Sequence, residues 1–409
     1  MGPYPVRRLA CSSSSSNMRI LSCQSPYGQG GVGQHFAQLV EETKQRNALV
    51  HYYNEAPAPE DEKDGHAIST PLFSWLHQWT PVRYSPSWSS YLKNECFDRR
   101  VAAALETPAE RFMGFVGQAL HSFHRAEEIG VDTLELVAVN SHVNNVQRLH
   151  QQAAEDTGIR DTWLNEMQRR KILAEYDKAD HIYVHSEYTR TSFLEAGMPS
   201  EKLERTILEV APRFEPPETR PDDDRFRVVY VGRLDATKGI PLLLNAFHQL
   251  PDPAQLTLVG GWSTSRMRRY MQRWQEKEPR LRIAPGDPLP VLHQADVFAH
   301  PSYEDGFGYA PKEALACNVP VIVTEDTGMK ESVVEGQNGY IIPTGDEEAL
   351  LDRLRHLQAG HTLPIQSEPT ETESDVPTSE VIPQYAKVQD DEGRDEEPRR
   401  DASKTPPRH

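Results

Sequence analysis

Cysteine is scarce in this sequence, and long apolar runs are missing. Four cysteines occur among 409 residues, without the spacing of a metal site or a disulfide framework: Cys11, Cys23, Cys96 and Cys317. Isolated thiols suit a reducing compartment, so we expect a cytoplasmic protein. No run of about 18 apolar residues occurs, so the sequence offers no transmembrane span. A peripheral contact with a membrane stays open.

Positive charge is also in short supply. The 44 Lys and Arg residues stand against 61 Asp and Glu residues, which gives a formal net charge of -17 at neutral pH. A chain this acidic repels the phosphate backbone of a nucleic acid. We therefore expect no nucleic-acid partner.

The two ends of the chain have little apolar content. Residues 1–17 contain Arg7, Arg8 and a run of serines, but they lack the apolar core of a secretory signal. We expect a disordered N-terminal extension there, or sequence upstream of a true start at Met18. Residues 361–409 hold 12 Asp and Glu against 6 Lys and Arg, with many Ser, Thr and Pro. Such a segment buries too little apolar surface to offset the entropy of ordering, so we expect a disordered acidic tail.

Between the ends, short apolar runs alternate with helical stretches. In the second half of the chain such runs lie at 226–234, 255–261, 281–286, 295–300 and 319–328. This alternation is typical of a doubly wound parallel sheet. Similar runs occur upstream, beginning at Met18 and again at 133–142 and 180–198, where Ser186 is predicted to cap the helix that Glu187 begins.

The chain is too long for one ordinary domain, and its runs fall into two sets. We predict an α/β fold with two Rossmann-like, doubly wound parallel-sheet domains, at 18–210 and 225–360. The proline-rich, charged residues 211–224 read as the linker between them. Residues 54–100 are polar and rich in Trp and Tyr without a sustained period, so we expect an irregular, variable region there.

The most informative stretch is PSYEDGFGYAPKE at 301–313. It places Asp305 and Glu313 eight positions apart around a turn formed by Gly306, Phe307 and Gly308. A buried strand is predicted before this turn and a helix over 310–317 after it. A strand, a glycine turn and a helix N-terminus together form an anion-binding corner, which suits a sugar nucleotide.

This stretch resembles the motif of the retaining nucleotide-sugar glycosyltransferases of family 4, the group 1 glycosyltransferases. In that family a carboxylate is followed by seven residues and a glutamate; here the motif stands as DGFGYAPKEALA, with Asp305 in the first acidic position and Glu304 just before it. The resemblance implies the GT-B architecture, in which the two domains face across a cleft. The second domain would hold a nucleotide-diphosphate-sugar donor, and the first would hold a sugar, lipid or small-molecule acceptor.

The resemblance also implies roles for residues of the second domain. Arg233 and Lys238, which follow the apolar run at 226–234, would hold the donor diphosphate, because fixed cations stabilise the charge that gathers on a departing phosphate. Neither a metal nor a separate cofactor is then expected. Asp305 and the backbone of residues 306–308 would position the donor sugar, and Glu313 would bind the nucleotide ribose.

In the first domain the implied site residues are fewer. Gly31 and Gly33, in a glycine-rich loop before an amphipathic helix, would face the donor phosphates across the cleft. His142 ends an apolar run and is a catalytic candidate, although a histidine at a strand end is as often a hydrogen-bonded structural residue.

Several alternatives stay open at this point. The chain could be a nucleotide-sugar-binding partner subunit without turnover, or an enzyme that epimerises or hydrolyses the nucleotide sugar. The family usually ends with helices that cross back onto the first domain, and only residues 381–388 could hold a degenerate form of one. The sequence names neither the base, the sugar nor the acceptor.

Overall fold

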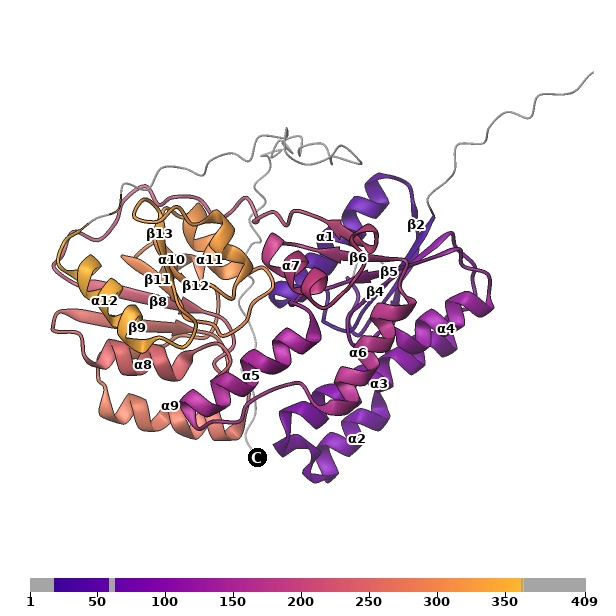
Figure 1. Cartoon of the computed structure of the whole chain (residues 1–409), viewed down its shortest axis with the longest axis horizontal. Helices are drawn as coiled ribbons and strands as arrows, with labels where there is room; N and C mark the ends of the chain where they lie inside the picture. The colour runs from indigo at the N-terminus through magenta and orange to yellow at the C-terminus, as the bar shows by residue number, and fades with distance from the viewer. Residues whose placement is uncertain (1–17, 59–62, 362, 364–409) are drawn as a thin grey trace, which may run out of the picture. The chain divides into compact units, whose positions relative to one another are not determined.

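The protein contains two parallel β-sheets, each covered by helices (Figure 1). The computed structural model describes residues 18–58, 63–361 and 363. The predicted α/β fold with two Rossmann-like domains is confirmed. The expected N-terminal extension, most of the expected acidic tail and the possible crossing helix at 381–388 lie outside the described residues.

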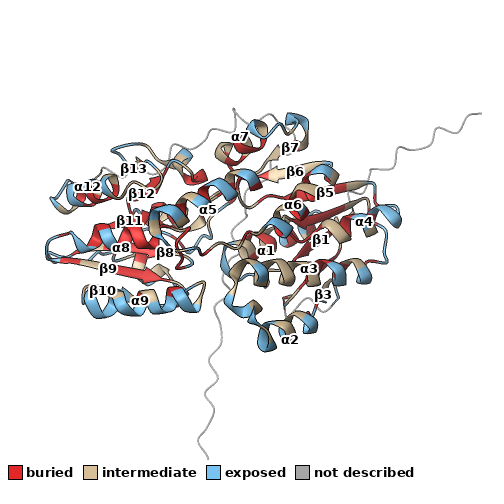
Figure 2. Ribbon diagram, turned by 60° about the horizontal axis from the view of Figure 1, so that its bottom comes forward, coloured by how far each residue is buried: buried red, intermediate tan, exposed pale blue. Residues whose placement is uncertain are grey.

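The first sheet has seven strands in the order β3-β2-β1-β4-β5-β6-β7, and every neighbouring pair is parallel. Its strands are β1 (Arg19–Cys23), β2 (Leu49–Asn54), β3 (Gly65–Ala67), β4 (Arg111–Phe115), β5 (Thr133–Val137), β6 (His181–Val184) and β7 (Leu203–Arg205). Its helices are α1 (Gly30–Gln45), α2 (Pro71–Trp79), α3 (Pro86–Ala104), α4 (Leu120–Glu128), α5 (Val143–Thr157), α6 (Glu166–Lys178) and α7 (Glu187–Glu195), with short 3-10 turns η1 (Pro81–Tyr84) and η2 (Ser200–Lys202). Figure 2 shows the strands as largely buried.

The second sheet has six parallel strands in the order β10-β9-β8-β11-β12-β13. Its strands are β8 (Phe226–Val231), β9 (Ala254–Val259), β10 (Leu281–Ile283), β11 (Val297–His300), β12 (Val321–Thr324) and β13 (Gly339–Ile342). Its helices are α8 (Ile240–His248), α9 (Ser265–Lys277), α10 (Leu289–Leu292), α11 (Tyr309–Ala316) and α12 (Glu347–Gln358), with η3 (Gly328–Ser332) as a 3-10 turn.

In both sheets the strand order reverses beside the first strand, between β1 and β4 and between β8 and β11. Such a switch point opens a crevice beyond the carboxyl ends of the strands, because the connections on its two sides leave in opposite directions. The loops after β8 and β11 carry the motif residues of the second domain. The fold therefore places these residues where ligands bind in open α/β sheets.

Within the Trp- and Tyr-rich region at 54–100, residues 71–100 are largely helical, and for them the expectation of an irregular region was wrong. Pro71 and Pro86 occupy the first helical positions of α2 and α3, where the fixed φ of proline favours helix formation. The helical period of α2 is hidden in the sequence because both its inner and its outer faces carry large apolar residues, among them the exposed Trp75 and Trp79.

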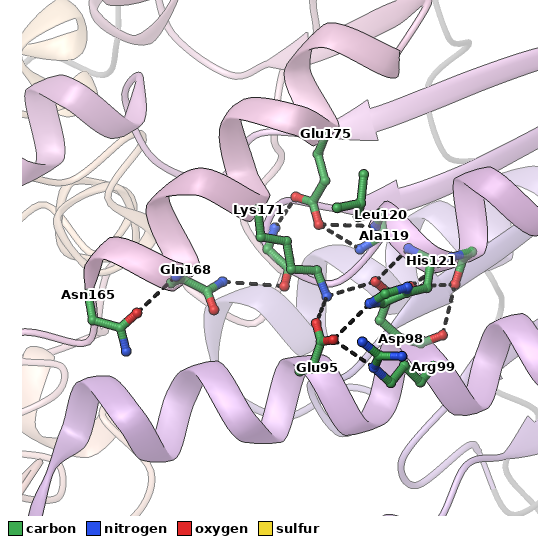
Figure 3. A network of polar contacts seen from close by, with 12 residues as sticks. Glu95, Asp98, Arg99, Ala119, Leu120, His121, Asn165, Gln168, Lys171 and Glu175 are labelled. Carbon is green, nitrogen blue, oxygen red and sulfur yellow. Dashed lines mark hydrogen bonds and ion pairs between the residues drawn. The ribbon is translucent and has the colours of Figure 1, made fainter.

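A network of buried charges ties α3 to α4 and α6 (Figure 3). The Lys171 ammonium on α6 lies 2.7 Å from Asp98 Oδ2 and 3.0 Å from Glu95 Oε2, both on α3. Asp98 also accepts a 2.9 Å hydrogen bond from the Ser122 backbone N–H. Glu175 accepts from the backbone N–H groups of residues 119 and 120. The network thus satisfies the free N–H groups at the start of α4 and fixes three helices against one another.

Candidate functional site

A cavity of about 340 Å³ is lined by residues of both domains. The second domain contributes every Asp, Glu, Lys and Arg among the residues that line it: Arg233, Lys238, Glu304 and Asp305. The first domain contributes uncharged groups, including Gly31, His35, Val139, Asn140 and His185. Burial lowers the pKa of His185 to about 4 and also lowers that of His35, so both rings are neutral at neutral pH.

The two cations follow β8 and the loop after it, as expected from the sequence. Lys238 Nζ lies 2.7 Å from Asp305 Oδ2 and donates to the Glu304 backbone carbonyl at 3.0 Å. The Arg233 Nε donates to the Asp235 carboxylate, and about half of the Arg233 side chain is exposed. Lys238 is therefore held in place by the second domain, while the rest of the Arg233 guanidinium faces the cavity as a donor.

Asp305 is an ionised carboxylate held between two partners. Burial by itself would raise the pKa of Asp305, but Lys238 and His300 hold it well below its ordinary value. His300 Nε2 lies 3.1 Å from Asp305 Oδ2, and burial lowers the pKa of His300, so the neutral ring donates to the carboxylate. Lys238 and Asp305 together form a charged pair whose position is fixed before a ligand arrives.

Glu304 joins the two domains by hydrogen bonds. This role was not predicted from the sequence. Its carboxylate accepts hydrogen bonds from Asn140 Nδ2 at 2.7 Å and from the Ser141 backbone N–H at 2.8 Å, both after β5 of the first domain. Burial raises the pKa of Glu304 to about 6. The only signal in the sequence was the position of Glu304 directly before Asp305, which does not reveal a partner 164 residues away.

Gly306 lies against the backbone of the first domain. A Cβ atom at this position would stand 2.4 Å from the Val139 carbonyl oxygen and 2.8 Å from Asn140 Cα, so only glycine fits. Ser186, which caps α7 as predicted, donates to the Gly306 carbonyl at 2.6 Å, and Thr189 Oγ1 does so at 2.9 Å. The backbone of the first domain thus makes the close approach that was expected at this glycine. A contact of Gly306 with the sugar nucleotide stays a prediction.

Of the other predicted glycines and Phe307, some line the cavity and others shape the backbone elsewhere. Gly31 and Phe307 line the cavity. Gly33 lies inside α1, where a Cβ atom would stand 2.1 Å from the Pro26 carbonyl oxygen. Gly308 caps α11 with a φ of 87°, a left-handed conformation that favours glycine. The structure therefore gives Gly33 and Gly308 backbone roles and does not bring them to the cavity wall.

Glu313 and His142 are not among the residues that line the cavity. Glu313 lies on α11, where burial raises its pKa to about 7. His142 caps α5 by accepting from the Asn144 N–H at 3.3 Å, and its ring packs against Tyr176 and Phe193 with centroid distances of 5.2 Å. These contacts match the structural alternative for His142, and no contact in the structure supports its catalytic role.

The described residues contain neither a metal-binding cluster nor a membrane-spanning helix. Within residues 18–58, 63–361 and 363, no group of three or more His, Cys, Asp or Glu side chains is arranged to hold a metal ion. No helix in the same part of the chain is both long and apolar enough to cross a membrane.

Residues 213–363 match the family model described as glycosyl transferases group 1. The chain is similar to the capsular polysaccharide biosynthesis glycosyltransferase CapM of Staphylococcus aureus, with 31% identity over 141 residues, 33% of this chain and 37% of that protein. It is also similar to a GDP-mannose-dependent alpha-(1-6)-phosphatidylinositol monomannoside mannosyltransferase of Mycolicibacterium smegmatis, with 32% identity over 211 residues, 44% of this chain and 53% of that protein. The matches thus span only 37% and 53% of these relatives' own lengths.

Solved structures with a similar fold cover most of this chain. Sucrose-phosphate synthase from Thermosynechococcus elongatus superimposes with a TM-score of 0.66 at 18% identity, over 85% of this chain and 92% of that chain. At this identity the likeness concerns the fold alone. The predicted GT-B architecture and the resemblance to the group 1 glycosyltransferases are confirmed.

Proposed function

We propose that this chain transfers a sugar from a nucleoside-diphosphate sugar to an acceptor hydroxyl, because residues 213–363 match the family model of the group 1 glycosyl transferases. The observation that carries this proposal is the grouping of Arg233, Lys238 and Asp305 at one wall of the cavity, opposite an uncharged wall. A diphosphate suits the cations, and a neutral hydroxyl suits the uncharged wall. We propose that the donor is a hexose or a related sugar and that the sugar keeps its anomeric configuration.

The cations act on the leaving group. As the bond between the sugar C1 and the phosphate oxygen breaks, the electron pair stays on that oxygen and the diphosphate gains negative charge. Lys238 is already held by Asp305 and by the Glu304 carbonyl, and so it needs little reorganisation to stabilise this charge. Arg233 adds a second cation to the same wall.

Two further tasks are to hold the donor sugar, which falls to Asp305, and to accept the proton of the acceptor hydroxyl, which falls to the departing phosphate. An ionised Asp305 can accept hydrogen bonds from hydroxyls of the donor sugar while one of its oxygens stays paired with Lys238. The acceptor hydroxyl forms the new bond to C1 on the face from which the diphosphate leaves, and its proton passes to the departing phosphate oxygen. Among the residues that line the cavity the first domain supplies no carboxylate. Burial lowers the pKa of its three histidines, that of His35, that of His150 to about 3 and that of His185 to about 4, so these rings are weak bases, which supports a mechanism without a separate protein base.

We also propose that the reaction takes place in the cytoplasm. The three cysteines of the described residues, Cys23, Cys96 and Cys317, are free thiols. A reducing compartment keeps thiols in this state.

The test is acceptor-dependent release of nucleoside diphosphate by the purified full chain. UDP-, GDP- and ADP-sugars are supplied with and without a panel of sugar and lipid-linked acceptors, and NMR reads the anomeric configuration of the product. We expect release to require an acceptor and to be the same in EDTA as in magnesium. Release without any acceptor would instead identify a hydrolase, and binding without release would identify a partner subunit. Loss of activity in EDTA that magnesium or manganese restores would contradict the metal-free mechanism.

A further inference from the structure

Large apolar side chains gather on the outer surface of one corner of the first domain. We call the five side chains on α2, η1 and the start of α3 the α2 patch, with exposed fractions of 61% for Leu72, 56% for Trp75, 70% for Trp79, 67% for Tyr84 and 47% for Trp88. Among the described residues, the other exposed large apolar side chains are Met167 at 45%, Ile207 at 53% and Trp262 at 42%. A cluster of this kind marks an interaction surface.

The helix α2 presents part of this patch as one stripe. Leu72, Trp75 and Trp79 follow one another at helical spacing, so they lie on the same face of α2. Phe73 and Leu76 are half-buried, and none of the side chains of α2 is fully buried. Figure 2 shows α2 with an exposed outer surface. The helix therefore rests on its neighbours by one side and leaves a row of apolar groups on the other.

The segment that carries the patch has an unusual composition for this acidic chain. Residues 65–94 contain no Asp or Glu, although the whole sequence has 61. Arg83 lies within the patch, and its guanidinium donates to the Gln78 carbonyl at 2.9 Å and to the Tyr84 hydroxyl at 2.8 Å. Both of these partners are uncharged. The surface thus offers aromatic rings and a cation, with no acid of its own segment to repel an anionic partner.

Ion pairs and hydrogen bonds fix the position of α3, the helix that carries part of the patch. The buried network of Figure 3 fixes α3 against α4 and α6 through Lys171. Asn165, which caps α6, also donates to the Ser87 carbonyl in the first turn of α3 at 2.9 Å. Trp163, two residues before Asn165, lines the cavity. The patch is therefore presented by a fixed scaffold that continues to the wall of the site.

We propose that the α2 patch docks this protein on the surface of a lipid bilayer that contains anionic lipids. Trp and Tyr prefer the level of the headgroups because their rings are apolar and their N–H and O–H groups are polar. Arg83 in an acid-free segment suits anionic headgroups. With nine residues, α2 is far too short to span a bilayer but suits a helix that lies in its plane. This inference needs only the surface and does not depend on the proposed transfer reaction.

The experiment is flotation of the purified full chain with vesicles. One set contains phosphatidylcholine with phosphatidylglycerol, and the other contains phosphatidylcholine alone. We expect the wild type to float with the first set. The double variant Trp75→Ser/Trp79→Ser should bind these vesicles at least about tenfold more weakly, because it no longer transfers two large apolar side chains from water into the bilayer. Arg83→Gln should weaken binding to the anionic vesicles and change binding to phosphatidylcholine less.

The control is Trp262→Ser, an exposed tryptophan in the second domain, which should float like the wild type. Because Trp75 and Trp79 are exposed, their replacement should leave the melting temperature unchanged. A second readout is quenching of tryptophan fluorescence by brominated phosphatidylcholine, which should fall in the conservative variant Trp75→Phe/Trp79→Phe. The proposal is overturned if the wild type does not float with either set, or if the serine double variant floats equally well. It is also overturned if light scattering shows a wild-type dimer that the double variant lacks, without vesicle binding.

Discussion

The two domains both contain paired charged side chains, but they place them differently. In the first domain Lys171 lies between Glu95 and Asp98, inside the contact of α3 with α6. In the second domain Lys238 and Asp305 form their pair at the wall of the cavity. Charge in the first domain therefore holds helices together, whereas charge in the second domain is in reach of a ligand.

This difference suggests a division of labour across the cavity. The histidines on the wall of the first domain are neutral, since burial lowers the pKa of His185 to about 4. A neutral wall does not compete with Lys238 and Arg233 for a diphosphate, and its rings can hydrogen-bond to hydroxyl groups. Variants that remove one charge from each domain should separate a loss of stability from a loss of turnover.

The largest effect is expected from Lys171→Met in the first domain. The variant leaves Glu95 and Asp98 buried without their cation, and breaking a buried pair in this way costs about 3–5 kcal/mol of the free energy of unfolding. Urea denaturation measures the loss. The matched control is Lys178→Met on the same helix, whose partner Glu127 is half exposed, and it should cost less than about 1 kcal/mol. Equal losses in the two variants would show that the network of Figure 3 does not stabilise the first domain.

Lys238→Ala in the second domain should act on turnover instead. Loss of one preorganised charge that stabilises the leaving group typically lowers turnover by about 10²-fold or more. Initial rates with a saturating donor measure this effect, and the loss in free energy of unfolding should be smaller than that of Lys171→Met. Lys277→Ala, which removes a cation that lies over Trp274, is the control and should keep its rate. A folded Lys238→Ala protein with the turnover of the wild type would refute the role of this lysine.

Glu304→Gln tests the contact between the domains and should have the smallest effect. Burial raises the pKa of Glu304 from 4.5 to about 6, so the folded state binds a proton more tightly than the unfolded state. Its contribution is fully present below pH 4.5 and is lost as the pH rises through about 6, by about 2 kcal/mol in all. Chemical denaturation across this range should show the free energy of unfolding of the wild type falling relative to the variant. Parallel curves would mean that Glu304 keeps an ordinary pKa.

Much of the fold and part of the site could be predicted from the sequence. Apolar runs bounded by turns predicted the parallel strands, because a buried strand needs only a short local pattern. The stretch 301–313 predicted a strand, a glycine turn and a helix, and α11 (Tyr309–Ala316) lies within one residue of its expected bounds. Arg233 and Lys238 reach the cavity because they lie in the loop after β8. This strand stands beside the point where the strand order reverses, so the loop after it borders the crevice.

The tertiary structure alone decided which neighbours these residues meet. Glu304 meets Asn140 from the other domain, Gly306 lies against Val139, and His142 turns to Tyr176 and Phe193 rather than to the cavity. Local patterns report which side of an element is apolar, but they carry no information on contacts between segments far apart in the chain. Those contacts depend on how the residues after β5 pack against the residues after β11. This packing decides which side chains line the cavity and which hold the domains together.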